Sequence, residues 1–431
     1  MSLLIKGGRV VDPAAGLDGY FDILVEEDLI AGIMAPGSEP VAADEVYEAG
    51  GRLVLPGLVD LHVHFGEPGR EERETIKSGT MAAARGGFTT VLMMPDTEPP
   101  LDDPAVLAQA LDIASRKSAI RVLAAGALSK ELAGREMTEL AGLVAAGATG
   151  LVEPDRLPAN KALLRRILQY AAPLGAFIAV HPVEYDLLGS GVMHEGAQST
   201  AFGIPGIPAA AEEVAVAACL LLIAATGTPL HLSGISTAGS VRLIARAKED
   251  GLPVTCDTSP YHLVLTDEYM SGYEASGKLL PPLRPPEDVA ALVAGLTDGT
   301  IDCVATNHTP YPPEEKDIEL DKAPFGAVAL EVAWPLLYHH LVREGRLSLR
   351  RLVEAMSAKP AALLGLAGKG TGTLRLGGPA DLVIVNPEAQ KVVQPESFCS
   401  KGRSTPVSGR LLSGWPEATV AGGRLVWRES R

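Results

Sequence analysis

Residues 53–69 read Leu-Val-Leu-Pro-Gly-Leu-Val-Asp-Leu-His-Val-His-Phe-Gly-Glu-Pro-Gly. This mostly apolar run carries two histidines, His62 and His64, two positions apart near its end. Side chains at positions i and i+2 of a strand point to the same side, so both imidazoles should face one direction. At the carboxyl end of a barrel strand that direction is the active site, where two imidazoles form half of a divalent metal site. The alternative is a pair of histidines that only hydrogen-bond to their neighbours.

Seven more short apolar runs follow the first one, and most are separated by helical stretches rich in Ala, Leu, Glu and Arg. The runs are 89–94, 121–126, 150–153, 177–181, 230–233, 253–256 and 302–306, and the clearest helical stretches are 72–85, 104–117, 161–172 and 241–248. Eight strands alternating with helices predict an α/β protein with a parallel (β/α)8 TIM-type barrel. A doubly wound open sheet is the alternative, but no GxGxxG motif follows a strand.

Both ends of the chain have the character of β-strands. Short alternating stretches separated by Gly and Pro occupy residues 3 to about 55, and the pattern returns at 381–385 and 419–427. We therefore expect two domains: a small β domain built from residues 1–52 and 371–431, and a barrel over residues 53–370.

The charge and the cysteines limit the functions to consider. The 431 residues include 53 acidic and 37 basic ones, a net charge of −16, which disfavours nucleic acid and anionic membranes as partners. The N-terminus lacks the pattern of a signal peptide, and the longest apolar stretch, 214–225, is too short to span a bilayer. The four cysteines are far apart, which favours a reducing compartment. We expect a cytoplasmic protein.

Further candidate metal ligands stand at the ends of later strands. His181 and His231 belong to the fifth and sixth runs, Glu153 ends the fourth, and Asn307 with His308 follows the eighth. A single histidine at a strand end is more often structural. Several in the same phase favour a metal centre, because the carboxyl ends of barrel strands converge on one mouth.

Longer motifs make the chain similar to one known family. They lie at residues 60–69, 86–90, 94–100, 261–263, 281–284, 306–310, 378–382 and 400–406, with Glu74 and Ser78-Gly79 between the first two. Together they resemble the bacterial-type dihydroorotases of the amidohydrolase superfamily. Allantoinases and hydantoinases share the HxH motif, but segments 94–100 and 400–406 favour dihydroorotase.

The resemblance implies a reaction, a metal centre and a set of catalytic and substrate-binding residues. The family reversibly closes N-carbamoyl-aspartate to dihydroorotate in pyrimidine biosynthesis. Metal ions polarise the ring amide and generate hydroxide from water. An aspartate after the eighth strand binds metal and shuttles the proton, and an arginine with asparagines holds the substrate carboxylate.

Several substrate-holding positions depart from the family pattern. Gly66 stands where the family has arginine, which removes a bidentate grip on a carboxylate. Asp96 replaces an asparagine and would repel an anion, and Leu280 replaces another asparagine. Tyr311 stands where the family has histidine, whereas His262 keeps its place in a Tyr-His-Leu motif.

The metal and proton-transfer positions are also changed. The family's Thr-Asp-Asp-Gly becomes Val-Glu153-Pro-Asp, and its second His in His-x-x-His becomes Gly234. The proton-shuttling aspartate is Asn307, and an amide cannot accept a proton as a carboxylate does. His62, His64 and His181 remain, with Glu153 or His231. We expect at most one ion, zinc, or none.

Three hypotheses follow. The first is a non-catalytic dihydroorotase homologue that acts as a structural partner of aspartate carbamoyltransferase. The second is an active, diverged cyclic amidohydrolase with one metal ion and a neutral cyclic amide or imide as substrate. The third is a dihydroorotase that works with substituted ligands. The resemblance also implies a homo-oligomer.

Overall fold

The computed structural model describes residues 2–37, 43–158 and 160–429. Its centre is a sheet of eight strands in the order β15-β14-β13-β10-β9-β8-β7-β6, with every neighbouring pair parallel. A bridge between Val63 and His308 joins the two edges, which confirms the predicted barrel. The strands are β6 (Leu58–Val63), β7 (Phe88–Met93), β8 (Arg121–Ala127), β9 (Gly150–Glu153), β10 (Phe177–Val180), β13 (Leu230–Leu232), β14 (Val254–Thr258) and β15 (Cys303–Val304).

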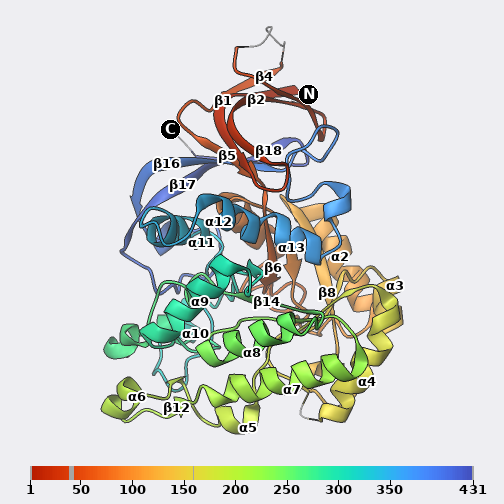
Figure 1. Ribbon diagram of the computed structural model, residues 1–431, viewed down its shortest axis with the longest axis vertical. Helices are drawn as coiled ribbons and strands as arrows, with labels where there is room; N and C mark the ends of the chain where they lie inside the picture. The colour runs from red at the N-terminus through yellow and green to blue at the C-terminus, as the bar shows by residue number, and fades with distance from the viewer. Residues whose placement is uncertain (1, 38–42, 159, 430–431) are drawn as a thin grey trace.

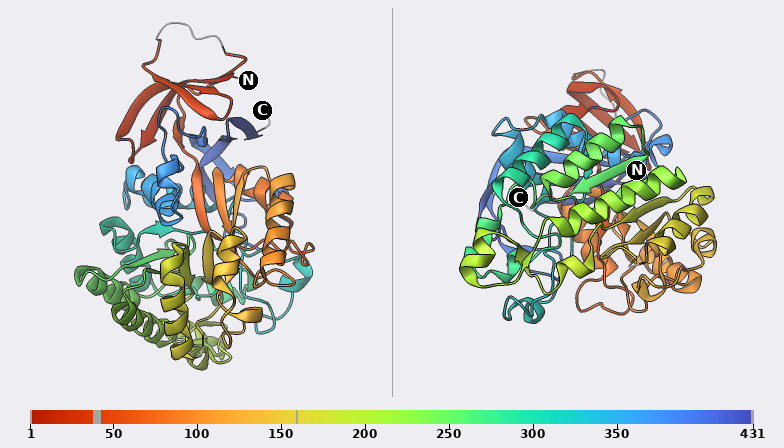
Figure 2. Two further views of the ribbon diagram at one scale, coloured as in Figure 1. Left: turned by 90° about the vertical axis from the view of Figure 1, so that its right-hand side faces the viewer. Right: turned by 60° about the horizontal axis from the view of Figure 1, so that its bottom comes forward.

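Helices cover the outside of this barrel (Figures 1 and 2). The longer ones are α1 (Ile76–Arg85), α2 (Pro104–Lys117), α4 (Lys161–Ala171), α7 (Ala210–Thr226), α8 (Ala238–Glu249), α9 (Pro286–Asp298) and α12 (Leu349–Met356), and shorter ones are α3 (Leu140–Ala145), α11 (Ala333–Leu337) and α13 (Ala358–Leu363). Side chains set their starts: Thr75, Asp103 and Thr237 each accept from a backbone N–H of the first turn. None of the described helices is long and apolar enough to cross a membrane.

A second sheet combines strands from both ends of the chain, at the top of Figure 1. Its order is β18-β17-β16-β5-β1-β2-β3, and β4 pairs with β1. The bounds are β1 (Ser2–Asp12), β2 (Leu17–Glu26), β3 (Leu29–Met34), β4 (Glu45–Glu48), β5 (Leu53–Pro56), β16 (Leu382–Val392), β17 (Leu411–Ala421) and β18 (Arg424–Arg428). A β domain made from both termini is therefore present.

The boundary between the two parts differs from the predicted one. The barrel was expected to begin at residue 53, but β5 pairs with β1 and β16 in the terminal sheet, and only β6 belongs to the barrel. The two strands separate at Gly57, where an added Cβ would lie 2.1 Å from Oγ1 of Thr89. A side chain does not fit at this crossing, so the barrel starts after Gly57 and not at residue 53.

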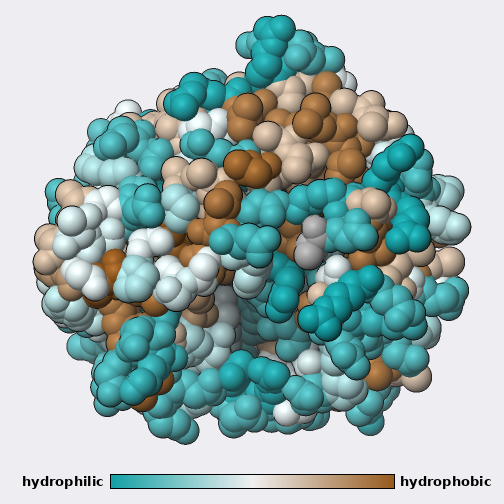
Figure 3. Space-filling model, turned by 90° about the horizontal axis from the view of Figure 1, so that it is seen from below, coloured by the Kyte–Doolittle hydropathy of each residue, from teal (hydrophilic) through white to brown (hydrophobic). Residues whose placement is uncertain are grey.

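The carboxyl ends of the barrel strands lie at the end away from the terminal sheet. The connection after β10 carries α5 (Tyr185–Leu188), β11 (Met193–His194), α6 (Ala197–Phe202) and β12 (Gly206–Ile207), and it lies at the bottom of Figure 1; α10 (Pro313–Lys316) follows β15. Seen from below, this face has a hollow near its centre surrounded largely by hydrophilic residues (Figure 3). The hollow is where the predicted site residues should converge.

Candidate functional site at the barrel mouth

The barrel mouth contains a cavity of about 330 Å³. Six of the residues selected from the sequence line it: His64, Asp96, His181, Leu280, Asn307 and Tyr311. The other five, His62, Gly66, Glu153, His231 and His262, are not part of the lining. The rest of the lining was given no role from the sequence, and it includes Asp155, Arg156 and Tyr185. The mouth therefore has a different set of polar groups from the one expected.

The two histidines of the HxH motif face the same way, as the strand period predicts. Nε2 of His62 lies 3.0 Å from Nε2 of His64, and Nδ1 of His64 lies 2.8 Å from Oδ2 of Asp96. Burial lowers the pKa of His62 well below its usual value, and the neighbouring His64 lowers it further. Burial acts against protonation of His64 as well, but the Asp96 carboxylate outweighs it and raises the pKa of His64. Of the two rings, His64 is therefore the more readily protonated, next to the Asp96 carboxylate.

Asp60 holds the base of this motif in place. Its side chain is fully buried and accepts hydrogen bonds from the backbone N–H groups of His62 and Thr306, at 3.1 and 3.0 Å. Burial raises the pKa of Asp60 to about 7 in spite of these bonds. Asp60 therefore ties the first barrel strand to the end of the last one. Its partner Thr306 lies far away in the sequence, so no role for Asp60 was predicted from the motif.

His181 reaches the mouth from the end of β10. Its side chain is 3% exposed, and Nε2 has no hydrogen-bond partner among the described residues. Burial lowers the pKa of His181 to about 4, so the ring is neutral at pH 7. A buried ring nitrogen without a partner is costly, which makes this atom a candidate contact for a ligand.

His231 and Glu153 are occupied within the barrel wall. Nε2 of His231 lies 2.9 Å from Oδ2 of Asp257, and its Nδ1 lies 2.9 Å from Oγ1 of Thr255. The Glu153 carboxylate accepts hydrogen bonds from the backbone N–H and the hydroxyl of Ser129, at 3.1 and 2.7 Å. Burial raises the pKa of Glu153 to about 7 against the effect of these bonds. Both side chains have their polar atoms satisfied away from the mouth.

The five predicted ligands do not come together as a metal centre. Within residues 2–37, 43–158 and 160–429, no group of three or more His, Cys, Asp or Glu side chains is placed to hold a metal ion. His62 and His64 contact each other, while His231 and Glu153 are engaged elsewhere. A catalytic zinc needs about three protein ligands. The donor set present does not fit that requirement.

Two of the substituted positions leave little room for a side chain. A Cβ added at Gly66 would lie 2.1 Å from the carbonyl oxygen of Arg70, whose N–H donates to the Gly66 carbonyl at 2.7 Å. Gly234 has a φ of +72°, and a Cβ there would lie 3.0 Å from Cε1 of His181. The backbone therefore excludes a side chain at Gly66, while at Gly234 the positive φ and the His181 ring make a side chain strained.

Asn307 stands at the mouth with a φ of +51°, in the left-handed region that asparagine tolerates better than most residues. Its Nδ2 donates to the carbonyl of Leu280 at 3.2 Å, which fixes the amide as a donor on that side. Oδ1 of Asn307 lies 3.4 Å from Oγ1 of Thr309. The side chain can position a ligand but has no basic oxygen with which to take up a proton.

Two of the predicted substrate contacts have mainly structural neighbours. His262 is 3% exposed and lies between Oγ of Ser259, at 2.7 Å, and the carbonyl of Pro281, at 2.9 Å. Tyr311 lies under the guanidinium of Arg73, 4.6 Å from the ring centroid, and burial raises the pKa of Tyr311 to about 12. Only Tyr311 of this pair borders the mouth.

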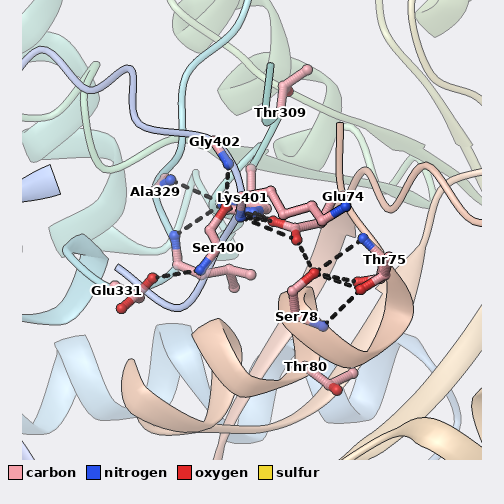
Figure 4. Close-up of polar contacts among 12 residues, drawn as sticks. Glu74, Thr75, Ser78, Thr80, Thr309, Ala329, Glu331, Ser400, Lys401 and Gly402 are labelled. Atoms are coloured by element: carbon pink, nitrogen blue, oxygen red, sulfur yellow. Dashed lines mark hydrogen bonds and ion pairs between the residues drawn. The ribbon is translucent and has the colours of Figure 1, made fainter. Parts of the chain in front are cut away.

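The C-terminal segment 400–402 is joined by hydrogen bonds to Glu74 and Glu331 (Figure 4). Glu74, fully buried, accepts from Oγ of Ser400 at 2.5 Å and from the N–H of Lys401 at 3.3 Å. Nδ1 of His308 accepts from the N–H of Ala329 at 3.1 Å, so its proton is on Nε2, 3.6 Å from Oε2 of Glu74. These contacts explain why segments near residues 74, 308 and 400 all belong to one sequence signature.

Glu331 in the same network should make the stability of the protein depend on pH. It accepts from the N–H of Ser400 at 3.1 Å and lies 3.0 Å from Arg85, yet burial raises the pKa of Glu331 to about 7. The folded chain holds the proton of this carboxyl more tightly than the unfolded chain does. The resulting stability is fully present below the pKa of the carboxyl in the unfolded chain, and it is lost as pH rises through 7. We expect the free energy of unfolding of the unmodified chain, relative to Glu331→Gln, to fall by about 2 kcal/mol between pH 5 and pH 7.

Urea titrations of both proteins at several pH values test this expectation. The exposed Glu249→Gln variant is the matched control and should follow the unmodified chain at every pH. A Glu331→Gln profile parallel to that of the unmodified chain would contradict the expectation.

The comparisons with known proteins agree with one another on the family. The Amidohydrolase family profile matches residues 53–426. The chain is 47% identical to a dihydroorotase of Pelotomaculum thermopropionicum, covering 100% of this chain and 99% of that protein, and 42% identical to one of Trichlorobacter lovleyi, covering 99% of each. Among solved structures it is similar to an L-hydantoinase (dihydropyrimidinase) of Arthrobacter aurescens, with a TM-score of 0.89 and 28% identity over 100% of this chain and 96% of that one. A dihydropyrimidinase of Brevibacillus agri gives a TM-score of 0.86 and 26% identity over 99% and 95% of the two chains.

Proposed function

The chain belongs to the dihydroorotases of the amidohydrolase family, and we propose that within this family it has impaired or lost catalysis and serves as a structural partner of aspartate carbamoyltransferase. Its place in pyrimidine biosynthesis follows from the family. The proposed loss of turnover follows from the mouth, where the family's charged and basic groups have been replaced.

The main support for the proposal comes from the contacts of the residues at the family's metal-ligand positions. Glu153 is bound by Ser129 and His231 by Asp257, and neither lines the cavity. Gly234 has no side chain, and its conformation does not accommodate one without strain. Each substitution alone could be compensated. Together they leave His62, His64 and His181 without a carboxylate that completes a metal centre.

The proton-transfer step has no replacement for the family aspartate. A positioned general base contributes about 10²–10⁴-fold to the rate of a reaction. Among the described residues, Asp96 is a carboxylate of the mouth that contacts the HxH motif. It is paired with His64. Asp96 also adds negative charge where the family substrate has a carboxylate, so both binding and turnover of dihydroorotate should suffer.

The first test is the metal content of the purified chain, measured together with dihydroorotate hydrolysis with and without added zinc. We expect at most one ion per chain and a kcat/KM at least about 10³-fold below that of the Pelotomaculum relative assayed in parallel. Comparable turnover that a chelator abolishes would overturn the proposal and identify a working dihydroorotase with substituted ligands.

The partner role rests on the chain's family and on an uncovered apolar surface. Residues 214–225 of α7 contain no polar side chain, yet Val214 and Leu221 are 50% and 72% exposed. An exposed apolar stretch of this kind on an acidic protein suggests a protein contact. Assembly with the aspartate carbamoyltransferase of the same organism should appear in analytical ultracentrifugation as a complex larger than either protein alone.

Matched variants distinguish the partner from self-association. Leu221→Glu should weaken the assembly, and Leu376→Glu, which changes a similarly exposed leucine after α13, should not. If Leu221→Glu changes only the size of the isolated chain, the surface joins copies of this chain and the transcarbamoylase is the wrong partner.

A second candidate is a hydrolase of neutral cyclic amides. The similarity to hydantoinase and dihydropyrimidinase structures favours it, as does the absence of an arginine at position 66 to hold a carboxylate. Turnover of hydantoin or 5,6-dihydrouracil by the purified chain, without turnover of dihydroorotate, would support this function over the structural role.

A further inference from the structure

The barrel mouth offers hydrogen-bond acceptors that the protein does not use. Oδ1 of Asp96 is buried and has no hydrogen-bond partner among the described residues, while its other oxygen is bound to His64. Nε2 of His181, on a side chain that is 3% exposed, is also unpartnered and lines the same cavity. Both are costly to leave unsatisfied in a buried setting. A ligand with N–H or O–H donors would satisfy both, with the proton of His181 on Nδ1.

A second carboxylate borders the same cavity. Asp155 follows β9, is exposed and lines the cavity, and its side chain has no hydrogen bond or ion pair within the described ranges. The nearby cation is Arg156, whose guanidinium lies 5.0 Å from the ring centroid of Tyr185. The mouth therefore presents two carboxylates, of which Asp96 is already paired with His64, and one arginine stacked on Tyr185.

The two carboxylates determine which ligand charge the mouth favours. A carboxylate ligand would meet Asp96 and Asp155 without the arginine that the family places at position 66. A planar cation with several N–H groups can bind a carboxylate through two parallel hydrogen bonds, which are stronger than neutral ones. The cavity of about 330 Å³ is within the range of small-molecule sites.

We infer that the mouth of this chain binds a small amidinium or guanidinium compound, held by Asp96 and Asp155, with an N–H donated to Nε2 of His181. The inference rests on the proposed loss of the family's grip on a carboxylate. It concerns binding and not turnover, so the two can fail separately.

Isothermal titration of the full chain with methylguanidinium, 5,6-dihydrouracil and dihydroorotate tests the inference at one fixed salt concentration. The three probes compare a cation, a neutral ring with N–H donors, and the same ring with a carboxylate. We expect methylguanidinium to bind at least about tenfold more tightly than dihydrouracil, and dihydroorotate to bind most weakly. Binding of dihydroorotate as tight as that of methylguanidinium, or no binding of methylguanidinium, would overturn the inference.

Three variants localise the site. Asp96→Asn and Asp155→Asn should each weaken methylguanidinium binding at least about tenfold. Asp96→Asn introduces the residue that the family has at this position, and Asp155 is exposed, so both variants should fold. Asp186→Asn changes an exposed aspartate in α5 outside the cavity lining and should bind like the unmodified chain. Equal affinity of all three variants would overturn the inference.

Turnover assays on the same preparations separate this inference from the proposed function. Efficient turnover of dihydroorotate would overturn the proposed loss of catalysis. Methylguanidinium binding that depends on Asp96 and Asp155 would still support the cation site in that case.

Discussion

Replacement of Arg284 by alanine should lower the free energy of unfolding by about 3–5 kcal/mol, because it leaves a buried carboxylate without its cation. Arg284 is 1% exposed and Glu212 is 2% exposed, with 3.7 Å between Nη2 and Oε2. The guanidinium also donates to Oγ of Ser236 at 3.0 Å and contacts Nδ1 of His194 at 3.0 Å. It therefore connects the start of α7 to the insertion that borders the mouth.

The effect of Arg284→Ala should depend on pH. Burial alone would raise the pKa of Glu212, but Arg284 and the hydrogen bonds from Ser236 hold it below its ordinary value. A depressed carboxyl pKa gives stability that is present at neutral pH and lost as pH falls through the folded value. The difference between the unmodified chain and Arg284→Ala should therefore shrink in acid.

Urea denaturation with and without a second change tests this account. Arg284→Met combined with Glu212→Gln removes both charges and should recover part of the loss. The control is Arg246→Ala, which removes an exposed arginine that lies 3.3 Å from Glu249 and from Asp250 and should cost less than about 1 kcal/mol. A loss in Arg284→Ala as small as in the control would show that the buried pair contributes little.

Replacement of Gly66 by arginine should cost about 3 kcal/mol of unfolding free energy or more, and it should not restore dihydroorotate binding. Arginine is the family residue here, so sequence alone suggests that the change repairs the site. The structure predicts the opposite, since the new Cβ would lie 2.1 Å from the Arg70 carbonyl oxygen and 3.1 Å from the Arg70 Cβ. Residues 66–70 would have to open before the new side chain could reach the mouth.

Thermal melting and dihydroorotate titration check this prediction. Gly50→Arg adds the same side chain at an exposed position where nothing lies within 4 Å of the added Cβ, and it should melt like the unmodified chain. The combined Gly66→Arg, Gly234→His and Asn307→Asp variant should also fail to bind stoichiometric zinc, because Gly234 has a positive φ and lies against His181. Stoichiometric zinc in a stable triple variant would show that these loops adapt readily.

The sequence by itself determined the architecture and the direction of the HxH histidines. Eight apolar runs with helices between them predicted the eight barrel strands, and the returning β pattern predicted a sheet made from both termini. The i, i+2 spacing of His62 and His64 placed their imidazoles together, as the contact of 3.0 Å confirms. These features depend on the period of a strand or helix, which neighbouring residues set. The identities at 66, 234 and 307 likewise showed from the sequence which family groups are absent.

Only the tertiary structure decided which polar atoms are free. Whether His231 could bind metal depended on Asp257, 26 positions away, and the role of Asp60 depended on Thr306, 246 positions away. The same holds for Asp155, whose place in the mouth follows from the path of the chain after β9. In a barrel, the groups that satisfy a side chain come from neighbouring strands and their loops, which are distant in sequence. A donor or acceptor can be recognised from its residue type, but its availability to a ligand depends on these long-range hydrogen bonds.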